Sequence, residues 1–473
     1  MSETTQGLNI SFHGAAGEVT GSKHLITTPA GSKILLDCGL FQGKRVEAAE
    51  KNKEFGFDPS DIDAVLLSHA HIDHSGLLPK LAKDGFSGKI YTTDGTMDLC
   101  DAMLHDSARI QEEDEAYFNR NKDTLPDTFV KREPLYRTED VDRVLKQFVG
   151  VKYREKIQVT PDIEAEFYDA GHVFGSGVIK LTIDTPEGYK KLIFTGDLGR
   201  HDMPILNDPE YAGEADYLLI ESTYGDRAHE GVSTLKEDLA EIINKTVERG
   251  GKIFIPVFAL ERTQEMILRL EELMYDKKIP SLDIFIDSPL AGKLTKVFEQ
   301  HPEYYDEDMK ERHARNPQVF SFENLKFTES VEESKELNFI RKPCIIMAGS
   351  GMMENGRIRH HLKFNIENEK NSLLVVGYQA VETLGRKIVE GQKSVPILGH
   401  DFEVKLELKI FKSMSAHADM HALDKYVQSV KGLKKVILIH GEQDSREAFA
   451  ERIKSMDLGA DIVMPTIGEK IDL

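Results

Sequence analysis

Short runs of β-branched and aliphatic residues recur along the first half of this chain, and several end in a residue that can bind a metal. Residues 63–67 predict a buried strand, and an apolar helical pattern begins soon after, at residues 77–81. Because strand ends gather at one edge of a sheet, the side chains that end such runs are expected to lie together. Five runs of this kind end at Asp37, His69, His172, Asp197 and Glu221.

The pattern changes after residue 226, where strand-like runs alternate with helical ones. A helix is predicted at residues 260–274, and strands at 252–256, 283–287, 344–348 and 372–376. Alternation of this kind is typical of a parallel sheet flanked by helices, and it indicates a second domain.

The pattern of the first half returns beyond about residue 396, with strand-like runs at 406–410 and 435–439. We therefore predict an α/β protein in which one domain is interrupted by another. The interrupted domain comprises residues 1–226 and 398–473, and the inserted domain comprises residues 227–397.

Composition supports two domains and constrains the partners. A chain of 473 residues is too long for one ordinary core, and 40% hydrophobic with 30% charged residues is typical of a soluble globular protein. The net charge of −21 argues against a protein that coats nucleic acid through bulk electrostatics. A polyanionic substrate would need a local basic groove or bound metal ions.

Cysteine usage and the first residues indicate the compartment. Cys38, Cys100 and Cys344 are scattered, so neither a disulfide framework nor a thiolate zinc site is predicted. The first seven residues lack a signal pattern, and no apolar run reaches the length of a membrane span. We expect a cytoplasmic protein without a membrane partner.

The densest chemical signal is the motif H-x-H-x-D-H, in which His69, His71, Asp73 and His74 fall within six positions. In an extended strand end His69 and His71 point the same way, and a following turn brings Asp73 and His74 to a second position. Imidazoles with a carboxylate suit zinc. A surface loop of unpaired histidines has no reason to hold these ligand types in register. Asp37 could be a further ligand, but a lone carboxylate fits better in the role of orienting the histidines that bind the metal.

The order of Asp37, the H-x-H-x-D-H motif, His172 and Asp197 resembles the metallo-β-lactamase superfamily. The later motifs ESTYGDR, SAHAD and IHGE resemble its β-CASP branch of nucleases, and the likeness extends over residues 12–442. The segments GAAGEVTGS, LDCGLFQG and AGSGMMENGRIRHHL are similar to compact bacterial RNA-degrading members, which in turn resemble the endonuclease that cleaves pre-mRNA 3′ ends. This resemblance implies a metallo-β-lactamase αββα sandwich with an inserted β-CASP domain, a parallel sheet flanked by helices.

The resemblance also implies roles for the site residues. Asp197 would bridge two zinc ions, Glu221 and His417 would be an additional catalytic pair, and Asp73 would take part in catalysis as well as binding. The expected metal ligands are His69, His71 and His172 for one ion, and Asp73, His74 and His440 for the other. A histidine at position 440 is typical of RNA-processing members, whereas DNA-repair members carry valine there.

These roles predict a zinc-dependent ribonuclease that uses a hydroxide shared by two metal ions to leave 5′-phosphate and 3′-hydroxyl ends. His417 would protonate the leaving oxygen, and Glu221 would orient its ring. The absence of a KH-like extension and of an RNase J-type C-terminal domain favours an endonuclease, with 5′-exonuclease activity left open. Single-stranded RNA is the expected partner, and the resemblance suggests a homodimer. The alternatives are a DNA nuclease, a small-molecule hydrolase and a catalytically inactive RNA-binding scaffold.

Candidate RNA contacts lie in the inserted domain. Ser350 and Gly351 occupy a strand-to-helix turn whose N–H groups could bind a phosphate, although such turns are often only tight packing. Candidates for phosphate contacts are Arg262, Arg357, Arg359, Arg386 and Lys387. The alternative for each is an ordinary surface charge. His360 and His361 lie in a helical stretch, where one is expected to face inward and neither to bind metal.

Overall fold

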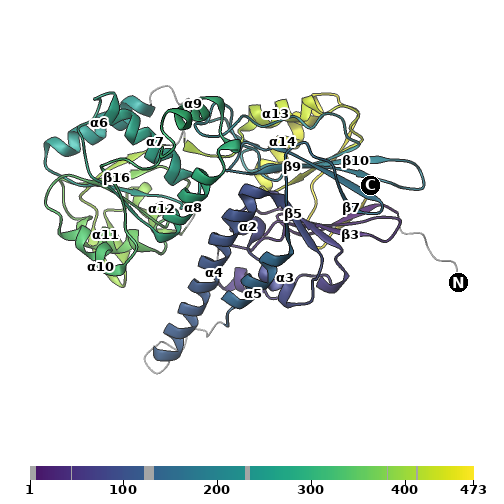
Figure 1. Cartoon of the computed structure of the whole chain (residues 1–473), viewed down its shortest axis with the longest axis horizontal. Helices are drawn as coiled ribbons and strands as arrows, with labels where there is room; N and C mark the ends of the chain where they lie inside the picture. Colours follow the sequence, from purple (N-terminus) through teal and green to yellow (C-terminus); the bar gives the residue numbers. More distant parts are fainter. Residues whose placement is uncertain (1–6, 44, 122–132, 230–234, 381, 412–413) are drawn as a thin grey trace. The chain divides into compact units, whose positions relative to one another are not determined.

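The computed structural model divides the chain into two compact units (Figure 1). Unit 1 comprises Met1–Ala228 and Ala416–Leu473, and unit 2 comprises His229–Ser415. The structure describes residues 7–43, 45–121, 133–229, 235–380, 382–411 and 414–473.

Unit 1 is built on two seven-stranded sheets. In spatial order the first sheet contains β22 (Lys470–Asp472), β1 (Asn9–Gly14), β2 (Lys23–Thr27), β3 (Lys33–Leu36), β4 (Ala64–Leu66), β5 (Lys89–Thr93) and β6 (Phe148–Val151). The second contains β21 (Asp461–Val463), β20 (Lys435–Ile439), β11 (Tyr217–Glu221), β10 (Lys190–Phe194), β9 (Gly177–Ile183), β8 (Ile163–Asp169) and β7 (Ile157–Thr160). Parallel pairing of β10, β11 and β20 brings the ends of these three strands to one edge.

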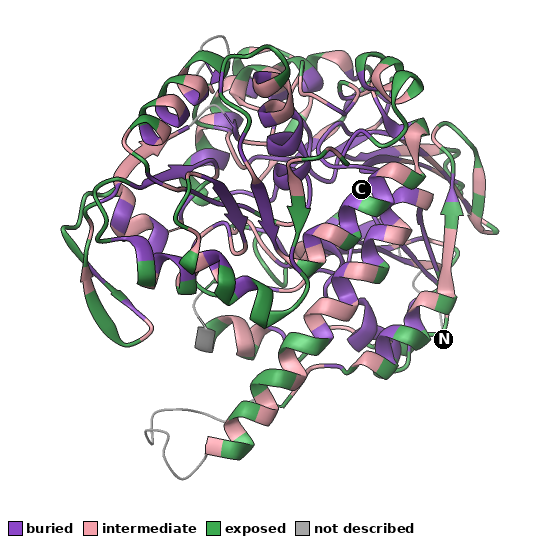
Figure 2. Ribbon diagram, turned by 60° about the vertical axis from the view of Figure 1, so that its left-hand side comes forward, coloured by how far each residue is buried: buried purple, intermediate pink, exposed green. Residues whose placement is uncertain are grey.

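The two sheets pack face to face around one apolar core. Phe12 and Leu66 of the first sheet cluster with Phe167, Phe194 and Ile437 of the second, and all five are buried. In Figure 2 the strands are drawn mostly in the purple of buried residues. Burial of this much aliphatic and aromatic surface is the main favourable term in the folding of such a sandwich.

Helices cover the outer faces of unit 1 (Figure 1). Residues of α13 and α14 pack on the second sheet in a separate apolar cluster, and α4 contacts β5 and β6 of the first sheet. The unit is thus an αββα sandwich, which confirms the predicted fold class. Its helices are α1 (Arg45–Lys51), α2 (Ile72–Ser75), α3 (Leu78–Lys83), α4 (Asp94–Asn121), α5 (Thr138–Val144), α13 (Met420–Ser429) and α14 (Gln443–Ser455), with short 3₁₀ turns η1 (Pro59–Asp61) and η2 (Leu145–Gln147).

Unit 2 contains a six-stranded sheet in which every neighbouring pair is parallel. Its central strands are buried throughout, as expected of a parallel sheet covered on both faces. In spatial order the strands are β14 (Leu325–Phe327), β13 (Ile284–Asp287), β15 (Ile345–Ala348), β12 (Ile253–Pro256), β16 (Ser372–Val375) and β19 (Glu407–Ile410), and a separate hairpin pairs β17 (Ser394–Ile397) with β18 (His400–Glu403).

Helices flank this sheet, as predicted for the inserted domain. Ile358 and Leu362 of α11 and Ile388 of α12 pack against Phe254 and Leu373 of the strands. The helices are α6 (Leu235–Glu248), α7 (Arg262–Tyr275), α8 (Pro289–Gln300), α9 (Glu307–Arg315), α10 (Val331–Glu336), α11 (Arg357–Asn365) and α12 (Leu384–Val389), with 3₁₀ turns η3 (Pro302–Tyr304) and η4 (Leu337–Phe339).

The second boundary of the inserted domain differs from the predicted one. The sequence pattern placed it between residues 397 and 398, but the compact unit continues to Ser415. The reason is β19, which pairs in parallel with β16 and so completes the sheet of unit 2. The first boundary differs by two residues, because unit 2 begins at His229 rather than at residue 227.

In the part of the chain that the structure describes, no helix is both long enough and apolar enough to cross a bilayer.

Candidate metal centre

The H-x-H-x-D-H segment follows β4 and runs into the single turn of α2. Backbone bonds hold this turn from two sides, because Ser22 N–H donates to the Asp73 carbonyl at 2.8 Å and Cys38 N–H donates to the His74 carbonyl at 2.7 Å. A Cβ on Gly39 would lie 1.6 Å from the Asp73 carbonyl oxygen, so only glycine permits this approach. The segment is therefore positioned by backbone packing, independently of any bound ligand.

The first ligand cluster joins His69 and His71 to His172 and Asp197, whose ligand atoms all lie within 4.8 Å of one another. His71 Nδ1 lies 3.1 Å from His69 Nε2 and 3.4 Å from His172 Nε2. Asp197 Oδ2 lies 3.6 Å from His69 Nε2 and 3.5 Å from His172 Nε2.

The second cluster joins Asp73, His74 and His440. The Nε2 atoms of His74 and His440 lie 3.1 Å apart, and Asp73 Oδ2 lies 3.7 Å from His440 Nε2. Asp197 faces this cluster as well, with Oδ2 3.4 Å from His74 and Oδ1 3.6 Å from His440. One buried carboxylate thus lies between both groups of ligands.

These separations fit divalent cations. Ligand atoms at about 2.0–2.1 Å from a tetrahedral ion lie about 3.3–3.4 Å from each other, close to the spacings observed in both clusters. Asp197 Oδ1 is buried and has no hydrogen-bond partner among the described residues, which is the condition of an atom that coordinates an ion. Burial would raise the pKa of Asp197, but the surrounding histidines His440, His74 and His417 hold it well below its usual value. The donor set of imidazoles and carboxylates therefore fits a divalent metal centre.

Asp37 orients a histidine of each cluster. Its Oδ2 lies 2.6 Å from His74 Nδ1 and accepts the Ser68 hydroxyl at 3.0 Å, and Ser68 Oγ in turn lies 3.0 Å from His69 Nδ1. Because Nδ1 of both rings is occupied in this way, both Nε2 lone pairs point into the site. The Ser22 hydroxyl donates to the same carboxylate at 3.1 Å.

His440 reaches the site from the distant end of the chain. It follows β20, its N–H donates to the Ala15 carbonyl at 2.7 Å, and its Nδ1 lies 3.1 Å from Thr223 Oγ1. The φ angles of His440 and Asp37 are +48° and +59°, a left-handed conformation that residues other than glycine rarely adopt. The surrounding structure therefore supports a backbone strain of about 1–3 kcal/mol at each of two strand ends that serve the site.

Glu221 and His417 form a pair beside the first cluster. His417 Nδ1 lies 3.2 Å from Glu221 Oε1, which also accepts the Leu198 N–H at 2.7 Å. His417 is brought there by backbone pairing with Gly199, two residues after Asp197. Burial lowers the pKa of His417, but the charge of Glu221 and its hydrogen bond outweigh it and raise the pKa to about 9. The Nδ1 atom of His417 also lies 3.9 Å from Asp197 Oδ2, so the ring stands at the edge of the first cluster, a position suited to a general acid.

Lys23 is a supporting residue that sequence reasoning missed. Its buried Nζ donates to the Gly21 and Gly39 carbonyls, each at 2.8 Å, and lies 4.0 Å from the centre of the Phe41 ring. It thereby joins the two segments that hold the Asp73–His74 turn. Burial lowers its pKa to about 8. A single lysine in a strand-like run carries no sequence signal for this contact.

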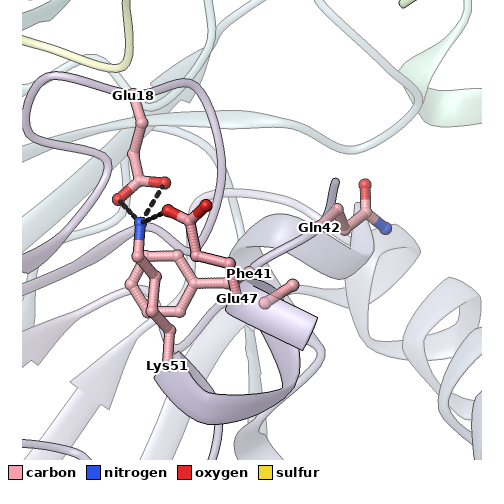
Figure 3. Close-up of a pocket in the computed structure, with 6 residues that line it drawn as sticks. Glu18, Phe41, Gln42, Glu47 and Lys51 are labelled. Atoms are coloured by element: carbon pink, nitrogen blue, oxygen red, sulfur yellow. Dashed lines mark hydrogen bonds and ion pairs between the residues drawn. The ribbon is translucent and has the colours of Figure 1, made fainter. Parts of the chain in front are cut away.

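Phe41 also borders a cavity of about 210 Å³ on this side of unit 1. Figure 3 shows Lys51 between Glu18 and Glu47, and its Nζ lies 3.0 Å and 3.2 Å from their carboxylates. Among the described residues that line the cavity, the charged side chains of Glu18, Glu47 and Lys51 thus pair with one another.

The candidate RNA contacts all lie in unit 2. Arg262 is 7% exposed and pairs with Glu265, and Arg357 donates to Asp287 Oδ1 at 2.7 Å. Arg359 donates to the Glu354 carbonyl at 2.8 Å. These guanidiniums are engaged within the unit, so their contact with RNA stays a prediction. The same holds for Ser350 and Gly351, which follow β15.

His361 faces inward and His360 is exposed, as expected of this helical stretch. The ring of His361 is buried, with Nε2 2.6 Å from Asp287 Oδ2 and Nδ1 3.0 Å from Asn338 Oδ1. Both ring nitrogens therefore have partners within unit 2.

Three family models match the chain, and together they cover most of it. Residues 17–254 match the metallo-beta-lactamase superfamily, and residues 263–388 match the Beta-Casp domain. Residues 401–465 match a domain described as the Zn-dependent metallo-hydrolase RNA specificity domain.

Characterised relatives match over nearly the whole chain. Ribonuclease TTHA0252 of Thermus thermophilus is 34% identical over 458 residues, which cover 97% of this chain and 98% of the relative. An RNase J-like protein of Methanocaldococcus jannaschii is 32% identical, with 94% of this chain and 95% of the relative covered. The transcription termination factor FttA of the same organism is 31% identical, with 95% and 69% covered.

Proposed function

Because this chain belongs to the metallo-β-lactamase superfamily and carries a β-CASP domain, we propose that it is a zinc-dependent ribonuclease that holds two zinc ions. Membership of this superfamily makes the protein a metal-dependent hydrolase. We propose in addition that its metal is zinc and that its substrate is RNA. The single observation that carries it is the position of the Glu221–His417 pair beside two facing ligand clusters. Such a pair supplies the proton that departure of an alkoxide needs.

RNA is favoured as the substrate by two similarities. The match to an RNA specificity domain spans residues 401–465 and so includes His417 and His440. A relative with 34% identity over 97% of the chain is named a ribonuclease. Since the overall charge of −21 repels a polyanion, attraction has to come from the metal centre and from local contacts.

Zinc ions bound at the two clusters would activate water and neutralise charge on the phosphate. Around them, Asp37 fixes the ring orientation of His74 directly and that of His69 through Ser68. Asp197 presents one oxygen to His440 and the other to His69, His74 and His172, so one carboxylate faces both clusters.

His417 donates the proton to the leaving oxygen, and Glu221 stabilises its charged form. Attack by water with departure of the 3′-oxygen leaves a 5′-phosphate and a 3′-hydroxyl. The ribose 2′-hydroxyl takes no part, so preference for RNA depends on binding. We propose internal cleavage of single-stranded RNA, by a protein that acts as a homodimer.

The proposal is tested with zinc-loaded protein and an RNA labelled at the 5′ end or at the 3′ end. Internal cleavage gives labelled fragments of several lengths from both substrates, and a chelator abolishes them. His417→Ala is expected to lower kcat by about 10²–10⁴-fold with the zinc content unchanged, because one general acid is lost. His400→Ala, which changes an exposed histidine in unit 2, is the matched control and is expected to be fully active.

Two outcomes would contradict the proposal. Zinc-loaded protein that leaves RNA intact, or a His417→Ala variant as active as the parent, excludes this mechanism. Equal cleavage of a DNA of the same sequence would instead assign a nuclease without RNA preference.

A further inference from the structure

Three loops of unit 2 leave the same edge of its sheet. The strands β15, β12 and β16 are adjacent and parallel, so the segments after them emerge side by side at their carboxyl ends. Gly351 follows β15, Phe258 follows β12, and Gly377 with Tyr378 follows β16. Ligands of open parallel α/β sheets bind at this edge.

Phe258 lies directly on the backbone of Gly351. A Cβ on Gly351 would be 2.7 Å from both Cδ2 and Cε2 of the Phe258 ring, a distance that real Cβ atoms do not show. A Cβ on Gly377 would be 3.8 Å from Cε2 of the same ring, which is ordinary van der Waals contact. Because position 351 has no side chain, the Phe258 ring can pack directly on the backbone there.

The loops around the ring are tied together. The buried Gln379 side chain donates through Nε2 to the Gly351 carbonyl at 2.9 Å and to the Gly377 carbonyl at 3.1 Å. The Thr263 hydroxyl donates to the carbonyl of Phe258 itself at 2.7 Å. The backbone of the three loops, including that of Phe258, is thus tied together by hydrogen bonds.

The Phe258 ring is exposed to solvent. Phe258 is 43% exposed and its neighbour across the edge, Tyr378, is 53% exposed, although the strands beneath them are fully buried. Exposure of aromatic surface gives up hydrophobic stabilisation. An exposed aromatic ring on loops that are tied together has the form of a stacking platform.

We propose that Phe258 stacks on a nucleobase of single-stranded RNA, with Tyr378 as an adjacent aromatic surface. The inference rests on the proposed ribonuclease function and adds a substrate contact in unit 2. A base suits the site because its flat face matches the ring, while its polar edge can reach peptide groups of the glycine loops. The contact is independent of charge, which suits a chain with a net charge of −21.

The test measures the affinity of zinc-loaded protein for a single-stranded RNA that contains 2-aminopurine, in a His417→Ala background that slows cleavage. Stacking quenches the fluorescence of this base. Phe258→Ala is expected to weaken binding about tenfold and to reduce the quenching, whereas Phe258→Trp retains both. Added salt should leave the ratio between the two variants nearly unchanged, because stacking carries no charge.

Gly351→Ala tests the packing of the ring on this backbone without removing the ring. The φ angle of Gly351 is not in the left-handed region, so the added methyl group conflicts only with the Phe258 ring and displaces it. We expect the same loss of affinity as for Phe258→Ala, and no further loss in the double variant. Gly377→Ala is the matched control, because its methyl group meets the ring at an ordinary distance.

Failure of this inference can be told from failure of the proposed function. Hydrolysis of bis(p-nitrophenyl) phosphate by the zinc-loaded wild-type protein reports on the metal centre without a base, and its absence would overturn the proposed function. Hydrolysis combined with unchanged RNA affinity in Phe258→Ala would overturn the stacking site alone. Phe339→Ala removes a phenylalanine that is 77% exposed on η4, and it should change neither measurement.

Discussion

Each unit of the protein contains a buried aspartate bonded to a buried histidine, and the two pairs have nearly the same geometry. In unit 1 Asp37 Oδ2 lies 2.6 Å from His74 Nδ1, and in unit 2 Asp287 Oδ2 lies 2.6 Å from His361 Nε2. Each aspartate stands at the end of a strand, Asp37 directly after β3 and Asp287 as the last residue of β13. What distinguishes them is the partner of the second ring nitrogen.

In unit 1 the second nitrogen of His74 lies 3.1 Å from His440 Nε2 and 3.4 Å from Asp197 Oδ2, both of which can bear lone pairs. In unit 2 the second nitrogen of His361 meets the Asn338 side chain at 3.0 Å, and Arg357 neutralises Asp287. A ring that faces several lone pairs needs a cation, whereas a ring with two protein partners is complete. We therefore expect the Asp–His pair of unit 1 to orient a metal ligand, whereas the pair of unit 2 stabilises packing.

The strongest test of this comparison replaces one aspartate by asparagine in each unit. Asp197→Asn is expected to lose bound zinc and to lower RNA hydrolysis by about 10³-fold, because several kcal/mol of transition-state stabilisation depend on the metal centre. Asp287→Asn, the matched change in unit 2, is expected to keep its zinc. Metal content by atomic emission and cleavage of labelled RNA measure both effects, and loss of zinc from Asp287→Asn would remove the distinction.

Asp37→Asn tests the orienting role itself. The amide keeps the shape but cannot accept the His74 and Ser68 hydrogen bonds as a carboxylate does, so zinc affinity should fall about 10–100-fold. Competition with a chromogenic chelator gives the affinity. An unchanged zinc affinity would show that the backbone bonds to the Asp73–His74 turn are sufficient to position the ligand.

The smallest effect concerns acid stability in unit 2. Burial would raise the pKa of Asp287, but its bonds to His361, Ser334, Thr328 and Arg357 lower it from 3.8 to about 2. Because the folded-state pKa is the lower one, this carboxylate stabilises the fold above about pH 4, by about 2 kcal/mol, and the contribution is lost between about pH 4 and pH 2. The protection factors of amides in β13 and α11, which compare the measured exchange rate with the intrinsic rate at each pH, should fall over that range.

Asp287→Asn provides the comparison for the pH experiment. Its protection factors should already be lower than those of the wild type at pH 5, and they should change less on acidification. Parallel pH profiles in the two proteins would exclude Asp287 as the group responsible.

Local patterns were sufficient to predict most of the fold but not the membership of every strand. The apolar runs at Asp37, His69, Asp197 and Glu221 each contain a strand, namely β3, β4, β10 and β11. Residues 406–410 alternate as a strand should, but each residue of β19 is half-buried, and such alternation is compatible with either sheet. Pairing with β16, which only the fold shows, assigns this strand to unit 2.

Some residues of the candidate site could likewise be predicted from local sequence, and others could not. The spacing of His69, His71, Asp73 and His74 is local, so it carries its own chemical signal. Thr223 beside His440 and Lys23 beneath the turn act through contacts between distant segments, and neither residue type is informative by itself.

The amino-acid sequence alone determined the residue types that can hold a metal, the strands that end in them, and a sheet wound with helices inserted between two parts of one domain. The likeness to a known family led us to expect that Asp197 serves both clusters and that His417 pairs with Glu221, and the tertiary structure gives the distances of both arrangements. That the second ring nitrogen of His361 meets Asn338 was decided by the tertiary structure alone. The physical reason is range. Side-chain alternation and apolar periodicity act over a few residues, whereas coordination and proton transfer depend on separations of 3–4 Å between atoms that the chain brings together from hundreds of residues apart.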